Sequence, residues 1–208
     1  MSKSNTGSQK GLQNKIQRLV IMAVLVAIVF VLQYMGVSIM ISQAFGIGIA
    51  LTLVPIVMGA VLYGPAFGAV LGTVFGLVVA YSVTQGMAGA VSAVMYAESP
   101  ILTLFLCVFK GLAAGFAAGI AGKLLMKKNQ YLGALCAAIA CPVVNTGIFL
   151  GGLLLYPDFA GATSLFFVIV LCNFALELVF NVICAPVIVR VIQALKKSGI
   201  LKINTGNV

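Results

Sequence analysis

Long apolar segments follow one another along almost the whole chain, and charged residues rarely interrupt them. The chain is 62% hydrophobic and 7% charged, whereas about a quarter of the residues of an ordinary soluble domain are charged. A helix needs about 20 consecutive apolar residues to cross a bilayer. We therefore expect an all-α integral membrane protein with six transmembrane helices, at residues 16–40, 50–62, 66–81, 100–125, 131–155 and 164–195.

Six such helices nearly exhaust the 208 residues, so no separate soluble domain fits beside them. The second apolar segment, 50–62, is short for a crossing, and we expect it to be irregular or to extend into its flanking loops. The segment 82–99 is the longest less hydrophobic stretch between two helices, and we expect a short helix within it.

The basic residues gather on one side of this arrangement. If the N-terminus is cytoplasmic, eleven of the twelve basic residues fall on the cytoplasmic side, and the acidic residues Glu98 and Asp158 fall outside. This distribution follows the positive-inside rule. We therefore expect a flexible cytoplasmic N-terminus at 1–14, a single six-helix transmembrane domain at 15–197 and a cytoplasmic tail at 198–208. The net charge of +9 thus reflects membrane topology and not binding of nucleic acid.

Topology leaves two charged residues unexplained, Lys110 and Glu177, which lie inside the fourth and sixth apolar segments. Each is expected about 15–20 Å below the external surface, near the bilayer centre. Asn173, Glu177 and Asn181 are spaced by four and share one helix face. Asn145, in the fifth segment, reaches a similar depth. Such groups are costly in a membrane unless they face a partner, a cavity or a ligand.

Two interpretations of these polar residues remain open. In the first, Lys110 and Glu177 form a buried ion pair that holds the fourth and sixth helices together, as in a structural subunit of a larger complex. In the second, Lys110, Asn145, Asn173 and Glu177 bind a small polar solute that enters from outside. Asn181 lies further toward the cytoplasm and is expected to serve helix packing.

The sequence contains no constellation that is typical of an enzyme. It has no His, no pair of carboxylates at catalytic spacing and no phosphate-binding loop. We expect no catalytic residue, no metal site and no cofactor, and we interpret the five cysteines as apolar packing residues. Without a nucleotide site, the chain cannot itself couple ATP hydrolysis to transport. A binding subunit that another protein energises fits best, and a stand-alone channel or facilitator is the alternative.

Small residues recur at intervals of four in several segments, which lets a neighbouring helix approach closely. We interpret the two glycine stripes as helix-packing surfaces. The spaced small residues are Ala23 and Ala27, then Gly64, Gly68, Gly72 and Gly76, and finally Gly111, Gly115 and Gly119.

Several motifs, taken in order, resemble the substrate-binding S components of energy-coupling factor (ECF) transporters. The resemblance covers nearly the whole chain, and it rests on the six expected helices together with these motifs. The motifs are Ala23-x-x-x-Ala27, Leu53-Val54-Pro55-Ile56, Tyr63-Gly64-Pro65-x-x-Gly68-x-x-x-Gly72, and Glu98-Ser99-Pro100 leading to Lys110-Gly111-x-x-x-Gly115.

The resemblance implies uptake of a scarce water-soluble vitamin across a cell membrane, and it implies a bacterial source. It implies as partners a transmembrane coupling (T) protein and two cytoplasmic ATPases, with Ala23 and Ala27 docking on the coupling protein. The ligand sites of the family lie in the outer half of the membrane, which matches the expected depth of Lys110, Asn145, Asn173 and Glu177.

The pattern around Pro55 and Gly64-Pro65 looks most like the pantothenate and folate subgroup. Lys110 could neutralise a carboxylate while Asn145 and Asn173 bind hydroxyl or amide groups, which suits pantothenate. Folate, riboflavin, cobalamin or a similar vitamin remains the alternative.

Overall fold

The structure, a computed structural model, describes residues 3–38, 51–156 and 163–198. These residues form α-helices and connecting turns, and the described part of the chain contains no strand. The helices are α1 (Lys3–Ser38), α3 (Leu53–Tyr63), α4 (Pro65–Thr84), α5 (Ala90–Glu98), α6 (Pro100–Met126), α7 (Gln130–Leu153) and α8 (Thr163–Lys197).

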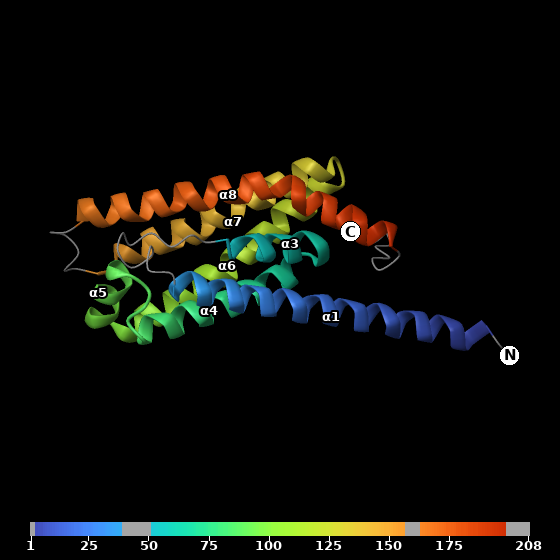
Figure 1. The fold of residues 1–208 in the computed structure, drawn as a ribbon, viewed down its shortest axis with the longest axis horizontal. Coiled ribbons are helices and arrows are strands. Elements are labelled where there is room, and N and C mark those ends of the chain that lie inside the picture. Colours follow the sequence, from blue (N-terminus) through green and yellow to red (C-terminus); the bar gives the residue numbers. More distant parts are fainter. Residues whose placement is uncertain (1–2, 39–50, 157–162, 199–208) are drawn as a thin grey trace.

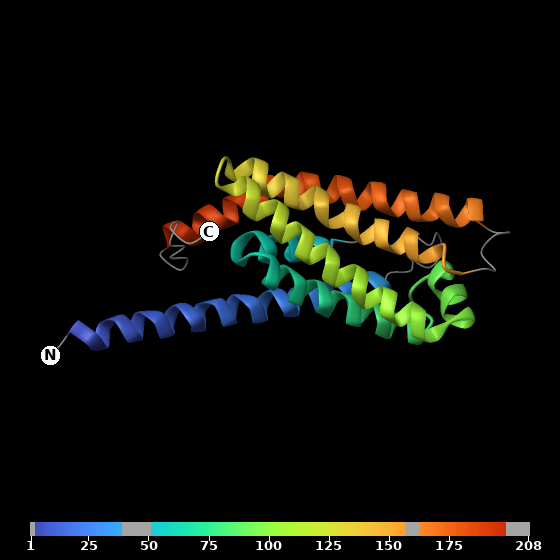
Figure 2. The ribbon, with the colours of Figure 1, turned by 180° about the vertical axis from the view of Figure 1, so that it is seen from behind.

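Figure 1 shows an elongated bundle in which the long helices run along the same axis. The start of α1 and the end of α8 lie at one end of the bundle, together with the turns that join α3 to α4 and α6 to α7 (Figures 1 and 2). We call this the inner end. α5 lies at the opposite end, which we call the outer end.

Basic residues gather at the inner end. The turn between α6 and α7 carries Lys127 and Lys128, and the last turn of α8 carries Lys196 and Lys197. Cytoplasmic segments are enriched in Lys and Arg, so the inner end is the end that the sequence predicts to be cytoplasmic.

Five helices are long and apolar enough to cross a membrane: α1, α4, α6, α7 and α8. The second expected span corresponds to α3, which has only 11 residues and a length of about 16 Å. α3 ends at Gly64, whose φ of 92° breaks the helix and whose N–H donates to the Ala60 carbonyl. Residues 51 and 52 of that expected span form a turn before α3, and residue 50 and the expected loop from Ser42 to Gly48 lie outside the described residues.

α1 is longer than the first expected span because it begins at Lys3. Residues 3–14, for which the sequence suggested a flexible segment, continue the helix without a proline to interrupt it. This polar part of α1 extends beyond the other helices at the inner end (Figure 1). The expected short helix within 82–99 is confirmed, because α5 covers Ala90–Glu98.

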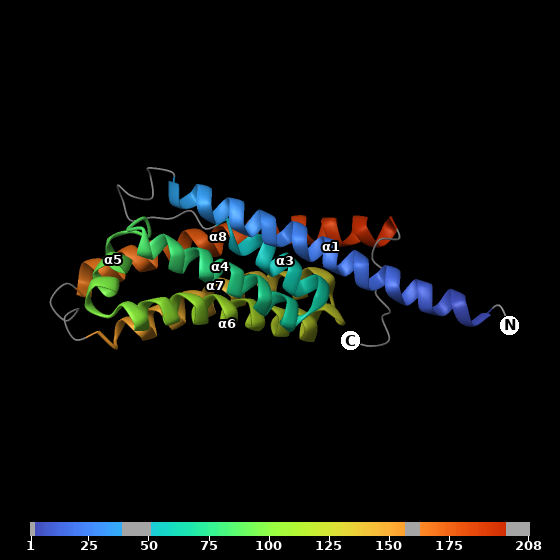
Figure 3. The ribbon, with the colours of Figure 1, turned by 90° about the horizontal axis from the view of Figure 1, so that it is seen from below.

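α4 and α6 run side by side (Figure 3) and pack through their glycine stripes. A Cβ atom added at any stripe position except Gly64, which has nothing within 4 Å, would overlap the opposing backbone. The predicted packing role of the stripes is therefore confirmed. The facing pairs are Gly68 with Gly115, Gly72 with Gly111, Gly76 with Cys107, and Gly119 with Pro65.

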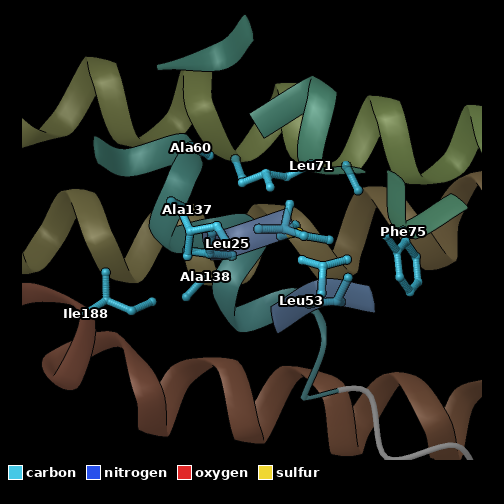
Figure 4. Packing of buried hydrophobic residues seen from close by; sticks show 14 of the residues in the cluster. Leu25, Leu53, Ala60, Leu71, Phe75, Ala137, Ala138 and Ile188 are labelled. Carbon is cyan, nitrogen blue, oxygen red and sulfur yellow. The ribbon is translucent and has the colours of Figure 1, made fainter. Parts of the chain in front are cut away.

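The short helix α3 lies at the centre of the bundle and contacts all five long helices. Its Leu53, Ile56 and Val57 side chains are fully buried. Figure 4 shows the core around it, to which Leu25 of α1 and Ile188 of α8 also contribute. Small side chains from α7, among them Ala137 and Ala138, complete this cluster and let the helices approach closely.

Candidate polar site between α6, α7 and α8

α7 lies between α6 and α8 and packs against both of them (Figure 1). It begins at an Asn129 N-cap, whose Oδ1 accepts hydrogen bonds from the backbone N–H groups of Tyr131 and Leu132. Asn145 and Phe149 are four residues apart on this helix and therefore share a face. Phe149 contacts Lys110 of α6, and Asn145 contacts Glu177 of α8.

Lys110 of α6 is partly buried, and its ammonium group lies over an aromatic ring. The Nζ atom is 4.4 Å from the centroid of the Phe149 ring. The negative face of an aromatic ring attracts a cation at this distance. Lys110 is about 15 Å along α6 from Pro100 at the outer end, in agreement with its predicted depth.

Glu177 of α8 is partly buried, and its carboxylate accepts a hydrogen bond from the side chain of Asn145. Asn145 is 5% exposed. The Asn145 Oδ1 and Glu177 Oε2 atoms are buried and have no hydrogen-bond partner within the described part of the protein. The bond therefore joins α7 to α8 while one acceptor oxygen on each side remains unused.

Lys110 and Glu177 lie close enough to influence one another electrostatically. Among the described residues, however, no Lys110–Glu177 salt bridge with a nitrogen–oxygen distance of 4 Å or less is found. The two opposite charges thus belong to one polar group without direct contact, since Phe149 and Asn145 lie on the helix between them.

The two asparagines of α8, Asn173 and Asn181, each lie one turn from Glu177, in opposite directions. Asn173 is partly buried and lies one turn toward the outer end. Asn181 is fully buried, and its Nδ2 atom donates to the backbone carbonyl of Glu177 at 2.8 Å. On the same helix, Ala185 and Ile188 belong to the core cluster. Asn181 therefore faces the packed interior, as the sequence predicted.

A second polar contact closes the outer end of α6 against the segment that follows α7. The hydroxyl groups of Thr103 and Tyr156 are 2.8 Å apart, and both residues are almost fully buried. The Glu98 carboxylate exerts an electrostatic influence on Tyr156. Sequence reasoning missed this contact and also missed Phe149. The spacing of four between Asn145 and Phe149 is the sequence signal that could have identified Phe149.

Ala23 and Ala27 are exposed on α1, whereas Leu25 and Val29 of the same helix are buried in the core. The small residues therefore lie on a face of α1 that other described parts of the chain leave uncovered. Within the described residues, no cluster of three or more His, Cys, Asp or Glu side chains could hold a metal ion.

The long apolar helices and the polar group buried among them define a multi-pass helical membrane protein. Residues 17–189 match the protein family described as ECF transporter, substrate-specific component. This match covers most of the chain, so the protein belongs to the family of substrate-specific components of ECF transporters. Comparison with curated proteins and with solved structures gives no significant match.

The family assignment confirms the resemblance at the level of the S component. The protein is a transporter subunit of the cell membrane and not an enzyme. Substrate-specific components of ECF transporters work with an energy-coupling module.

Proposed function

We propose that this chain binds a small water-soluble vitamin from the external side and delivers it inward with the help of an ATP-driven coupling module. The observation that supports the proposal is the polar group of Lys110, Asn145 and Glu177, which links α6, α7 and α8 within apolar segments. Such groups are costly inside a membrane. A ligand that satisfies them offsets part of that cost.

Each polar side chain offers a different chemistry to a ligand. Lys110 supplies a positive charge for a carboxylate, and Glu177 supplies acceptor oxygens. The carboxamides of Asn145 and Asn173 can both donate and accept hydrogen bonds. Together these four residues form the substrate-binding site that we propose, with Asn173 on the outer side.

Pantothenate is our first candidate substrate. It has one carboxylate for Lys110, and its amide and two hydroxyl groups match the carboxamides and the carboxylate. Folate is less suitable because it has two carboxylates for a site with one cation. Riboflavin and cobalamin offer no carboxylate to Lys110.

Native mass spectrometry of the purified protein tests this proposal most simply, because a tightly bound substrate is retained. Retained pantothenate would support the substrate assignment. A different retained vitamin would replace pantothenate and leave the role of the protein as a vitamin-binding subunit intact. Retention of a lipid or detergent molecule alone at this site, with no vitamin bound on addition, would contradict the proposed function.

We further propose that Ala23 and Ala27 dock on the transmembrane coupling protein, which is joined to two cytoplasmic ATPases. Both alanines are exposed on α1. Small side chains allow the backbones of two membrane helices to approach closely. In this proposal the coupling surface on α1 is separate from the binding site between α6, α7 and α8.

A further inference from the structure

The hydrogen bond between Asn145 and Glu177 leaves one acceptor oxygen of each side chain unused. The carboxamide nitrogen of Asn145 donates to the carboxylate, so Asn145 Oδ1 and Glu177 Oε2 are the remaining oxygens. Both atoms are buried and accept no hydrogen bond from the described residues. Because a hydrogen bond joins the two groups, these oxygens belong to one small patch of the site.

An unsatisfied buried acceptor destabilises a protein unless a donor reaches it. Lys110 is the nearby cation, but its ammonium group lies over the Phe149 ring and forms no salt bridge with Glu177 among the described residues. Asn181 donates to the Glu177 backbone and not to its carboxylate. Among the described residues, two neighbouring acceptors therefore have no donor, and Lys110 acts on Glu177 electrostatically without a salt bridge to it.

We infer that the substrate presents two neighbouring hydrogen-bond donors, hydroxyl or amino groups, to Asn145 Oδ1 and Glu177 Oε2. This inference rests on the proposed function and specifies the chemistry of its substrate. The Asn145–Glu177 pair determines specificity for the donor-bearing part of the molecule, and Lys110 binds an anionic or acceptor group elsewhere in it. Pantothenate, which has two hydroxyl groups and a carboxylate, belongs to this class.

The hydrogen bond from Asn145 engages one oxygen of the Glu177 carboxylate, so the other oxygen and Asn145 Oδ1 are the two acceptors left for a ligand. A ligand with a single donor would satisfy one oxygen and leave the other buried and unpaired. Such mismatches give strong discrimination, because a polar site rejects molecules that lack the expected group.

The test measures binding of three probes to the purified full-length protein by isothermal titration calorimetry. Pantothenate carries hydroxyl donors and a carboxylate, biotin carries two ureido N–H donors and a carboxylate, and nicotinate carries a carboxylate without paired donors. The variants Asn145→Leu and Glu177→Met each remove one acceptor. Asn181→Leu is the matched control, since it removes a buried asparagine one turn away on α8.

We expect a donor-bearing probe to bind at least about tenfold more tightly than nicotinate, and each acceptor variant to lose about tenfold or more. The Asn181→Leu protein should stay within about twofold of the original affinity. If the Glu177→Met protein fails to fold, the isosteric Glu177→Gln variant, which retains the shape of the site, replaces it. This variant also distinguishes hydroxyl donors from N–H donors on the ligand. A hydroxyl ligand can accept from the new amide and keeps part of its affinity, whereas an N–H ligand loses its binding.

Equal binding of nicotinate and the donor-bearing probes would overturn the inference. So would unchanged affinity in both acceptor variants, which would mean that water or Lys110 satisfies the two oxygens. A retained natural ligand without two neighbouring donors would overturn it as well. Failure of the proposed function has a different sign, because the chain alone would then carry the probe across the liposome membrane. The effect of the acceptor variants on that flux would still test whether the ligand presents two donors to Asn145 and Glu177.

Discussion

The Nζ atom of Lys110 lies 4.4 Å from the centroid of the Phe149 ring. Phe149 is one helical turn from Asn145, which in turn donates a hydrogen bond to Glu177. A connected series of contacts thus crosses from α6 through α7 to α8. A cation–π contact of this kind contributes about 0.5–2 kcal/mol. It holds the ammonium group in place without neutralising its charge, so the charge remains available to an anionic ligand.

Replacing Lys110 with Met should weaken binding of a carboxylate-bearing vitamin by about tenfold or more, because a charge-assisted hydrogen bond is lost. Calorimetric titration of the purified variant with pantothenate measures the effect. Lys123→Met is the control, since Lys123 is an exposed basic residue near the inner end of the same helix. Unchanged affinity of the Lys110→Met protein would remove Lys110 from the binding site.

Replacing Ala23 or Ala27 with Leu should abolish uptake and leave substrate affinity within about twofold, since a bulky side chain prevents close helix approach without touching the binding site. Uptake is measured with the complete transporter, and affinity with the isolated chain. Ala175→Leu makes the same change at an exposed alanine of α8 and should keep both properties. A variant that binds the substrate more weakly but still transports each bound substrate molecule would show that these alanines do not dock on the coupling protein.

Replacing Gly72 with Ala should destabilise the protein by about 1–3 kcal/mol, because the added Cβ atom would overlap the backbone of Gly111. A lower midpoint temperature of thermal unfolding in detergent would show this. Gly147→Ala adds the same atom where nothing lies within 4 Å. That control should be neutral or slightly stabilising because Ala favours the helix. Equal midpoints for the two variants would contradict the close packing of α4 on α6.

Replacing Tyr156 with Phe should cost about 1 kcal/mol of stability, because the buried Thr103 hydroxyl loses a hydrogen-bond partner. The same thermal unfolding assay measures the loss. Tyr131→Phe removes a hydroxyl from an exposed tyrosine at the start of α7 and should change little. Combining Tyr156→Phe with Thr103→Val tests the contact directly, since the two effects should not add if the hydroxyl groups bond each other.

The sequence predicted the features that depend on periodic patterns. The spacing of four identified the glycine stripes of Gly68 and Gly72 and their packing role, because such a pattern exposes backbone along one helix face. The same reasoning identified Lys110 and Glu177 as members of one polar group, because charges are rare in apolar segments and conspicuous there. It also separated Asn181, which is fully buried, from the residues nearer the outer end.

Other features had no pattern that would reveal them. Phe149 is one of many aromatic residues in apolar segments, so its contact with Lys110 depends on how α6 rotates against α7. The Thr103–Tyr156 contact joins residues 53 positions apart and requires the tertiary fold. The short second segment was recognised from its length, but hydropathy did not show that its helix, α3, begins only at Leu53 and lies at the centre of the bundle.

Uptake of radiolabelled pantothenate into proteoliposomes tests the central claim most directly. We predict uptake only when this chain is reconstituted with the coupling protein and its two ATPases and ATP is present on the ATPase side. Liposomes with this chain alone should bind the vitamin at the outer surface and accumulate none. Accumulation by the chain alone, or accumulation that does not depend on ATP, would contradict the account and favour a stand-alone channel or facilitator.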